Sequence, residues 1–250
     1  MNEPTQETEN ILIREKGTAK ETPAPLYDAA AKNRFEFELK EDGLKYDIAF
    51  TLNPLDDDER YMQWMRDFKI KGSEQDVSEE STEASCRYFD DVVDSVEGID
   101  FPPGADWKSL IRSSEKTDVM KAVLAVAISD PEIASKKPAF RASSEIEQVT
   151  IITECWFNGE VAQQKHVMRP RTAELEKKYA RISGKRFKQE NTRGLRRKPR
   201  VEYAPQDDKF GELYDQMKIS ATGFAGDVIP LRFKTTVVHE IFNSELDQKK

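Results

Sequence analysis

Apolar and polar residues alternate along two stretches of the chain, and each stretch contains a tight-turn pair. Residues 35–39 read Phe-Glu-Phe-Glu-Leu, and the alternation resumes over residues 46–50 after the pair Asp42-Gly43. Residues 149–157 carry an apolar residue or threonine at every second position, before the pair Asn158-Gly159. Alternation is typical of a strand with one buried face, and both pairs favour the positive φ angles of a two-residue hairpin turn. The pattern predicts two β-hairpins.

Each predicted hairpin is followed by a proline and then by a helical pattern. Pro54 and Pro170 end the second strands, because proline cannot donate to a ladder. Apolar residues at helical spacing then predict helices over residues 56–70 and 172–182. Further helices are expected over residues 87–96, 107–111, 117–128, 210–219 and 235–245. The acidic, serine-rich residues 72–85 are expected to be a mobile insert.

The two halves share landmark residues at constant spacing. Glu38, Gly43 and Pro54 stand 116 residues before Glu154, Gly159 and Pro170. A second block matches residues 88–91 to 213–216 at a spacing of 125, and a third matches residues 116–124 to 234–242 at a spacing of 118. The ordered blocks predict an α+β fold of two related lobes from an internal tandem duplication, each a β-hairpin followed by helices. The alternative is two unrelated α+β segments that share turn chemistry.

These boundaries divide the chain into four parts. Residues 1–34 are rich in Glu, Thr and Pro, which predicts a flexible N-terminal arm. Within the arm, the run Ile11-Leu12-Ile13 is expected either to dock as a short strand or to be a linear binding motif. An acidic α+β lobe is expected over residues 35–130, a linker over 131–148, and a basic α+β lobe over 149–246.

The formal charges of the two lobes have opposite signs. Residues 35–130 hold 11 Lys and Arg against 24 Asp and Glu, a net charge of −13. Residues 149–246 hold 18 against 13, a net charge of +5. Opposite charges attract within a chain or between chains, so this asymmetry concerns association rather than fold.

The sharpest single feature is a basic segment over residues 181–200, which contains one acid, Glu190. Its nine basic residues are Arg181, Lys185, Arg186, Lys188, Arg193, Arg196, Arg197, Lys198 and Arg200. Clustered Lys and Arg bind phosphate backbones by releasing counterions, so nucleic acid is one candidate partner. The alternative is a solvated loop that orders against an acidic protein surface, including the acidic lobe of another copy.

Composition restricts the class of protein. The hydrophobic fraction is 37% and the charged fraction 34%, and the longest apolar stretch, residues 119–128, falls far short of the roughly 20 residues of a membrane span. The acidic N-terminal residues do not resemble a signal peptide. Two cysteines make no disulfide framework. We therefore expect no membrane association and no secretion by a signal peptide.

No catalytic, cofactor-binding or metal-binding constellation stands out. His166 is expected to pack like Phe50, its partner at the spacing of 116, and Cys155 to be a small core residue. His239 is expected to be exposed. Trp156 and Phe157 are either core residues or an interface anchor. The three acids at 56–58 fit a helix N-terminus better than a calcium loop.

Short motifs in the second half resemble small proteins encoded among the tail genes of tailed phages and prophages. The motifs are residues 157–160, 166–170, 213–215, 229–230 and 234–242, with Glu174, Tyr179 and Gly223. The resemblance implies a non-enzymatic structural or assembly protein of a phage tail-like particle, found in the virion or in the host cytoplasm during assembly. Its implied partners are other tail proteins or itself. The alternatives are a nucleic-acid-binding module that uses residues 181–200, and an enzyme with a deep pocket that the sequence does not reveal.

Overall fold

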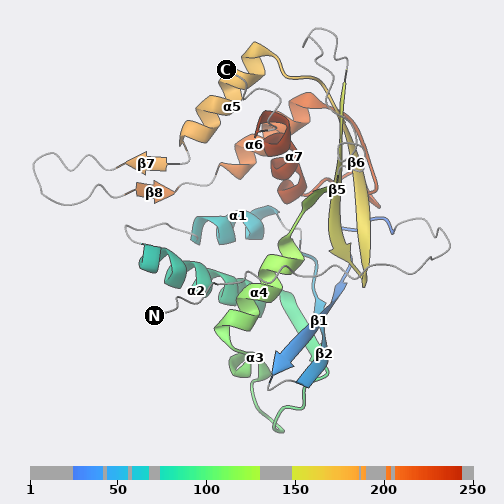
Figure 1. Cartoon of the computed structure of the whole chain (residues 1–250), viewed down its shortest axis with the longest axis vertical. Coiled ribbons are helices and arrows are strands. Elements are labelled where there is room, and N and C mark those ends of the chain that lie inside the picture. The colour runs from blue at the N-terminus through green and yellow to red at the C-terminus, as the bar shows by residue number, and fades with distance from the viewer. Residues whose placement is uncertain are drawn as a thin grey trace, which may run out of the picture.

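The computed structural model describes residues 25–41, 44–55, 58–67, 74–129, 148–185, 187–189, 201–203 and 206–243. Within these residues, seven helices and two main antiparallel sheets build two lobes, one above the other in Figure 1. The predicted α+β class is confirmed. No helix in this part of the chain has the length and apolar character needed to cross a membrane.

The first lobe consists of four helices and a three-stranded sheet. The strands are β1 (Asn33–Glu41), β2 (Leu44–Leu52) and β3 (Val93–Glu97), in the order β1-β2-β3. The helices are α1 (Asp58–Asp67), α2 (Glu74–Val92), α3 (Trp107–Leu110) and α4 (Ser113–Leu124), of which α3 is a single turn. The core lies between the sheet and helices α2 and α4, and its largest fully buried side chains are Leu52, Phe89 and Met120.

The second lobe has the sheet order β4-β5-β6-β9. Its strands are β4 (Ala127–Ser129), β5 (Val149–Phe157), β6 (Glu160–Met168) and β9 (Lys218–Thr222). Its helices are α5 (Ala173–Lys185), α6 (Asp207–Met217) and α7 (Leu231–Asn243), and a separate two-stranded ribbon joins β7 (Phe187–Gln189) to β8 (Val201–Tyr203). The core residues Phe210, Tyr214 and Phe233 are fully buried between helices and sheet.

Both predicted hairpins are present. In the second, Asn158 has φ 50° and Gly159 has φ 82°, the positive pair that a type I′ turn requires. Every second residue of β5 from Ile151 to Phe157 is buried, as the alternation predicted. The turn residues of the first hairpin, Asp42 and Gly43, lie outside the described residues.

The edge strands β3 and β9 pair with their neighbours in a corresponding register. Strand β3 pairs with β2 through Phe50↔Val96 and Thr51↔Ser95, followed by a shift before Leu52↔Val93. Strand β9 pairs with β6 through His166↔Ala221 and Val167↔Ser220, followed by a shift before Met168↔Lys218. Each β6 residue stands 116 positions after its β2 counterpart, and each β9 residue stands 125 positions after its β3 counterpart. The register shift falls at the corresponding place in both pairings. The pairing of the edge strand, with its break in register, therefore corresponds between the two sheets.

A glycine follows each of these strands in the same conformation. Gly98 has φ 86° and Gly223 has φ 94°, a region that residues with a side chain rarely adopt. A Cβ on Gly98 would overlap the main-chain oxygen of Asp47, and one on Gly223 would overlap that of Gln163. Glycine at these positions therefore allows the chain to turn tightly against the neighbouring strand.

The two lobes are joined by backbone pairing and by a buried arginine. Strand β4 follows helix α4 of the first lobe but pairs with β5, so it extends the second sheet. Arg232 of α7 is 3% exposed and donates to the main-chain oxygen of Val123 at 3.0 Å and to the Tyr27 hydroxyl at 2.5 Å. Leu231 N–H donates to the Asp58 carboxylate at 3.0 Å. These contacts hold the lobes in one arrangement.

Five predictions about local structure are wrong. The helices expected over residues 87–96 and 210–219 end at Val92 and Met217, because the residues that follow form strands β3 and β9. Residues 25–34 were expected in the flexible arm, but Tyr27 is buried in the second core and strand β1 begins at Asn33. Residues 72–85 were expected to be a mobile insert, whereas α2 begins at Glu74. The helix expected over 117–128 ends at Leu124, because residues 127–129 form β4. In each case a tertiary contact overrides local composition.

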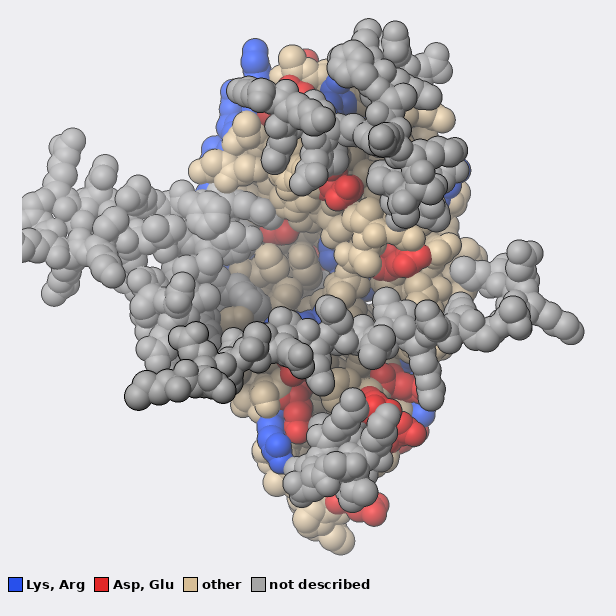
Figure 2. Space-filling view, in the orientation of Figure 1, with Lys and Arg blue, Asp and Glu red and all other residues tan. Residues whose placement is uncertain are grey.

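The charge asymmetry is visible on the described surface. Figure 2 shows Asp and Glu gathered on the lower, first lobe, where some Lys and Arg also lie, and Lys and Arg along the edge of the upper lobe where α5 lies, with some Asp and Glu on its face. Helix α5 presents Lys177, Arg181 and Lys185 as exposed residues.

Candidate functional site

The basic segment begins on a helix and continues into a β-ribbon. Arg181 and Lys185 are exposed near the end of α5, where positive side chains favour the helix dipole. Lys188 lies on β7, which pairs antiparallel with β8 through Phe187↔Tyr203 and Gln189↔Val201. The remaining residues of the segment, Arg186, Arg193, Arg196, Arg197, Lys198 and Arg200, lie outside the described residues.

The ribbon brings the two ends of a charged loop side by side. Residues 190–200 connect β7 to β8 and contain five basic residues and Glu190. In Figure 1 the ribbon points away from the helices of both lobes. The ribbon therefore projects from the second lobe and joins both ends of the basic sequence 190–200.

Trp156 and Phe157 occupy different environments. Phe157 is 6% exposed and its ring lies 5.0 Å from that of Tyr27, within the second core. The Trp156 ring meets Phe35 of the first lobe edge to face at 6.3 Å. Its main-chain oxygen accepts from the Asn33 side chain at 3.4 Å. Trp156 therefore anchors one lobe to the other within this chain.

His166 belongs to a buried chain of hydrogen bonds. Thr153 Oγ1 lies 3.0 Å from His166 Nε2 and donates to Gln164 Oε1 at 3.1 Å, while Gln164 Nε2 donates to Cys155 Sγ at 3.6 Å. On the other side of the ring, Tyr214 Oη lies 2.7 Å from His166 Nδ1. Thr153, Gln164, His166 and Tyr214 are each 0% exposed.

This geometry fixes the tautomer of His166. The single Thr153 hydroxyl proton is donated to Gln164, so Thr153 Oγ1 accepts from His166 Nε2–H. Nδ1 is then the acceptor and the Tyr214 hydroxyl is the donor. Burial lowers the pKa of His166 to about 4 and raises the pKa of Tyr214, because the charged forms lose hydration. Both side chains are neutral near pH 7, and the packing role expected for His166 is confirmed.

The corresponding positions of the first lobe are apolar. Phe50 and Phe89 stand where the second lobe has His166 and Tyr214, and their rings meet edge to face at 5.6 Å. The His166 and Tyr214 rings meet at 5.7 Å in the same orientation. The two cores thus keep one ring geometry with different chemistry.

Each lobe also has a lysine held over the inner ring. Lys116 Nζ lies 2.7 Å from Asp90 and 5.5 Å from the Phe89 centroid. Lys234 Nζ lies 2.9 Å from Asp215, with its ring contact to Tyr214 at 6.0 Å. The spacings had aligned these residues separately, but did not reveal that they form an ion pair in both lobes.

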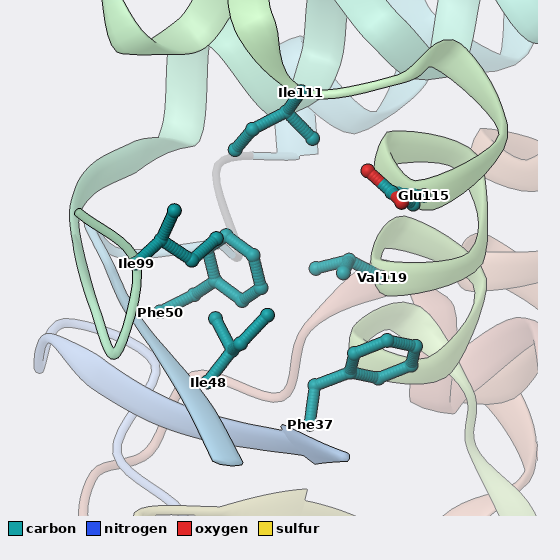
Figure 3. A pocket seen from close by; sticks show the side chains of 7 residues that line it. All are labelled: Phe37, Ile48, Phe50, Ile99, Ile111, Glu115 and Val119. Carbon is teal, nitrogen blue, oxygen red and sulfur yellow. The ribbon is translucent and has the colours of Figure 1, made fainter. Parts of the chain in front are cut away.

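The pocket of the first lobe is small. It lies between the sheet and α4, has a volume of about 20 Å³, and is lined by Phe37, Ile48, Phe50, Ile99, Ile111, Glu115 and Val119 (Figure 3). That volume holds about one water molecule. Glu115 is its only charged lining residue and accepts from the Arg112 N–H at 3.2 Å, which caps α4.

His239 is half-buried, so its expected exposure is wrong. Its Nδ1 lies 3.0 Å from the Tyr179 hydroxyl, and its ring lies 4.5 Å from that of Phe210. The part of the chain that the structure describes contains no group of three His, Cys, Asp or Glu side chains able to hold a metal ion. Of the three acids at 56–58, Asp58 begins α1 and binds the other lobe, and the other two lie outside the described residues.

Comparisons with protein-family models, with curated proteins and with solved structures found no match for this chain.

Proposed function

We propose that the chain is a non-enzymatic structural or assembly protein of a phage tail-like particle, acting through protein–protein contacts. The observation that carries this proposal is the opposite charge of two lobes joined in one arrangement, −13 over residues 35–130 and +5 over 149–246. A protein whose two lobes carry opposite charge is oriented by electrostatic attraction as it approaches a charged partner. The partner is another tail protein or a second copy.

The joint between the lobes supports this proposal. Arg232 and Asp58 each hydrogen-bond across the joint, and the rings of Trp156 and Phe35 pack there. A partner that binds both lobes therefore meets surfaces that are already oriented, which lowers the entropic cost of association.

We further propose that the lobes arose by internal tandem duplication. Support comes from the corresponding strand registers and from Gly98 and Gly223, which share one conformation. The pairs Lys116–Asp90 and Lys234–Asp215 add a third correspondence. A duplicated assembly protein offers two similar but differently charged surfaces to repeated neighbours in a particle.

The test is the molar mass in solution by light scattering, at low and high salt, alone and after co-expression with tail proteins. We expect an oligomer or a complex that weakens as salt screens the charges. Reversal of exposed first-lobe acids, Asp91→Lys and Asp106→Lys, should weaken association. Reversal of Lys165→Glu and Lys177→Glu is the matched change in the other lobe. A monomer at both salts that binds none of the co-expressed proteins would contradict the proposal.

Nucleic-acid binding is the second candidate, favoured by the β7–β8 ribbon. Its loop holds five basic residues between paired strands. Alanine at Arg193, Arg196, Arg197 and Arg200 should abolish binding of a fluorescent duplex and flatten its salt dependence. Alanine at four exposed basic residues outside the segment, Lys165, Arg169, Lys177 and Lys209, should change binding much less. Equal losses for both sets would exclude the ribbon as the binding site.

A further inference from the structure

The segment that precedes β1 docks on the second lobe in a specific way. Tyr27 N–H donates to the Gly223 oxygen at 2.9 Å, and the Ala225 N–H donates to the Tyr27 oxygen at 2.9 Å. Tyr27 and Phe224 thus form a parallel bridge beyond the end of β9. The Tyr27 ring is 3% exposed and packs on Phe224 and Phe233 at 6.3 and 5.1 Å. One side chain therefore closes that end of the second core.

The first lobe has the corresponding edge without such a segment. Gly98 and Ile99 follow β3 as Gly223 and Phe224 follow β9, and Gly98 shares the positive φ of Gly223. Strand β3 is an edge strand of its sheet, and in the described part of the chain no strand or bridge pairs with residues 98–100. Because the registers correspond, the Gly98 C=O and the Asp100 N–H face away from β2, as their Gly223 and Ala225 counterparts do.

The small pocket lies beside this edge. Ile99 and Phe37 line it and are both partly exposed (Figure 3). Glu115 stands at the position that Phe233 occupies in the second lobe, so the large ring that supports Tyr27 is replaced by a carboxylate. The edge therefore suits an aliphatic side chain followed by a positive charge, rather than a tyrosine.

We propose that Ile11-Leu12-Ile13 of the same chain docks along residues 98–100 as a parallel strand, with one aliphatic side chain over the pocket. The run is β-branched at two of three positions, which favours an extended backbone. Arg14 follows the run, and Glu115 and the exposed Asp100 lie at the edge. The proposal rests on the correspondence between the lobes, and not on the proposed assembly function.

The length of chain permits this docking within one molecule. Thirteen residues separate Ile13 from Tyr27, enough for an extended span of about 45 Å. A lobe of this size has a radius of gyration of about 13 Å, so neighbouring lobe centres lie about 25–30 Å apart. The run can reach the first lobe while Tyr27 remains on the second.

The test is amide hydrogen exchange by NMR on the full chain. The Asp100 amide and the amides of residues 11–13 should be protected together. The variant Ile11→Ser, Leu12→Ser, Ile13→Ser should speed Asp100 exchange at least about tenfold. The Ala225 amide should keep its protection, because Tyr27 is unchanged. The control variant Thr5→Ser, Gln6→Ser, Thr8→Ser alters the same arm outside the run and should leave Asp100 protected.

Three results would overturn the proposal. An Asp100 amide that exchanges at the unprotected rate in the unaltered chain would show that nothing docks there. Protection that the serine variant leaves intact would assign the edge to another segment, such as residues 130–147. Protection that grows with protein concentration would assign it to a second copy. The first two results do not bear on the assembly function, which light scattering tests separately, whereas the third would overturn this docking while agreeing with self-association.

Discussion

The Tyr214 hydroxyl lies 2.7 Å from His166 Nδ1, inside the core of the second lobe. In the neutral tautomer Nδ1 accepts the hydroxyl proton, whereas protonation of Nδ1 would require the buried hydroxyl to reorient and accept instead. The pKa of His166 is about 4 in the folded chain and about 6.5 when unfolded. The unfolded chain therefore binds the proton more readily, and the stability present above pH 6.5 is lost as the pH falls towards 4.

A double variant isolates this effect. His166→Phe with Tyr214→Phe reproduces the Phe50–Phe89 ring pair of the first lobe and removes the titrating group. Between pH 7 and pH 4, the free energy of unfolding of the natural chain should fall by about 3 kcal/mol more than that of the double variant. Denaturant unfolding at a series of pH values measures the difference. Parallel pH profiles would refute the assignment of acid sensitivity to His166.

The two positive-φ glycines should be sensitive to a single methyl group. Gly98→Ala and Gly223→Ala each add a Cβ that overlaps a main-chain oxygen, together with backbone strain. We expect each to lower the free energy of unfolding by about 2–4 kcal/mol. Gly104→Ala is the control, since Gly104 has φ 78° but nothing within 4 Å of the added Cβ. It should cost only about 1 kcal/mol, and an equal cost at all three would exclude the overlap as the cause.

The ion pair of the first lobe should respond unequally to loss of its two partners. Lys116 is 6% exposed, whereas the Asp90 side chain is 43% exposed. Asp90→Asn leaves a buried ammonium without its countercharge and should cost about 2 kcal/mol, while Lys116→Met should change stability by less than about 1 kcal/mol. Thermal unfolding measures both. Asp215→Asn should cost less than Asp90→Asn, because the Lys234 side chain is 19% exposed.

Removal of Arg232 should uncouple the lobes. Arg232→Ala takes a donor from the Val123 oxygen and from the Tyr27 hydroxyl, both at a buried joint. We expect a loss of about 2–4 kcal/mol and a calorimetric transition that separates into two. Arg181→Ala removes an exposed arginine of α5 and should leave one transition of unchanged midpoint. A single, equally cooperative transition in Arg232→Ala would show that other contacts couple the lobes.

Local pattern predicted the elements better than their partners. The hairpins were found because alternation and an Asn-Gly turn are signals between neighbours in the sequence. The end of α4 at Leu124 was missed because residues 127–129 become a strand only through pairing with β5. Tyr27 was placed in a flexible arm because its core lies almost 200 residues away along the chain, at Gly223 and Phe224.

The buried polar chain shows the same limit at the candidate site. Spacing aligned His166 with Phe50 and Tyr214 with Phe89, so both replacements of an apolar ring by a polar one were available in the sequence. The spacing did not predict that the two polar rings contact each other. The burial of Arg232 could not be predicted from the pattern, since a lone arginine on a helix is usually a surface residue. The charges of the ribbon were fully apparent, but their partner is not encoded in the composition.

Strand β4 and Tyr27 have a consequence for the order in which the molecule is made. Synthesis proceeds from the N-terminus, so residues 33–124 leave the ribosome with all three strands and four helices of the first lobe and can fold early. The second lobe takes one edge strand from residues 127–129 and one core ring from residue 27, both made long before α7. Both segments are therefore already synthesised when α7 emerges, and the folded first lobe, to which they are connected, holds them where the second lobe completes its folding.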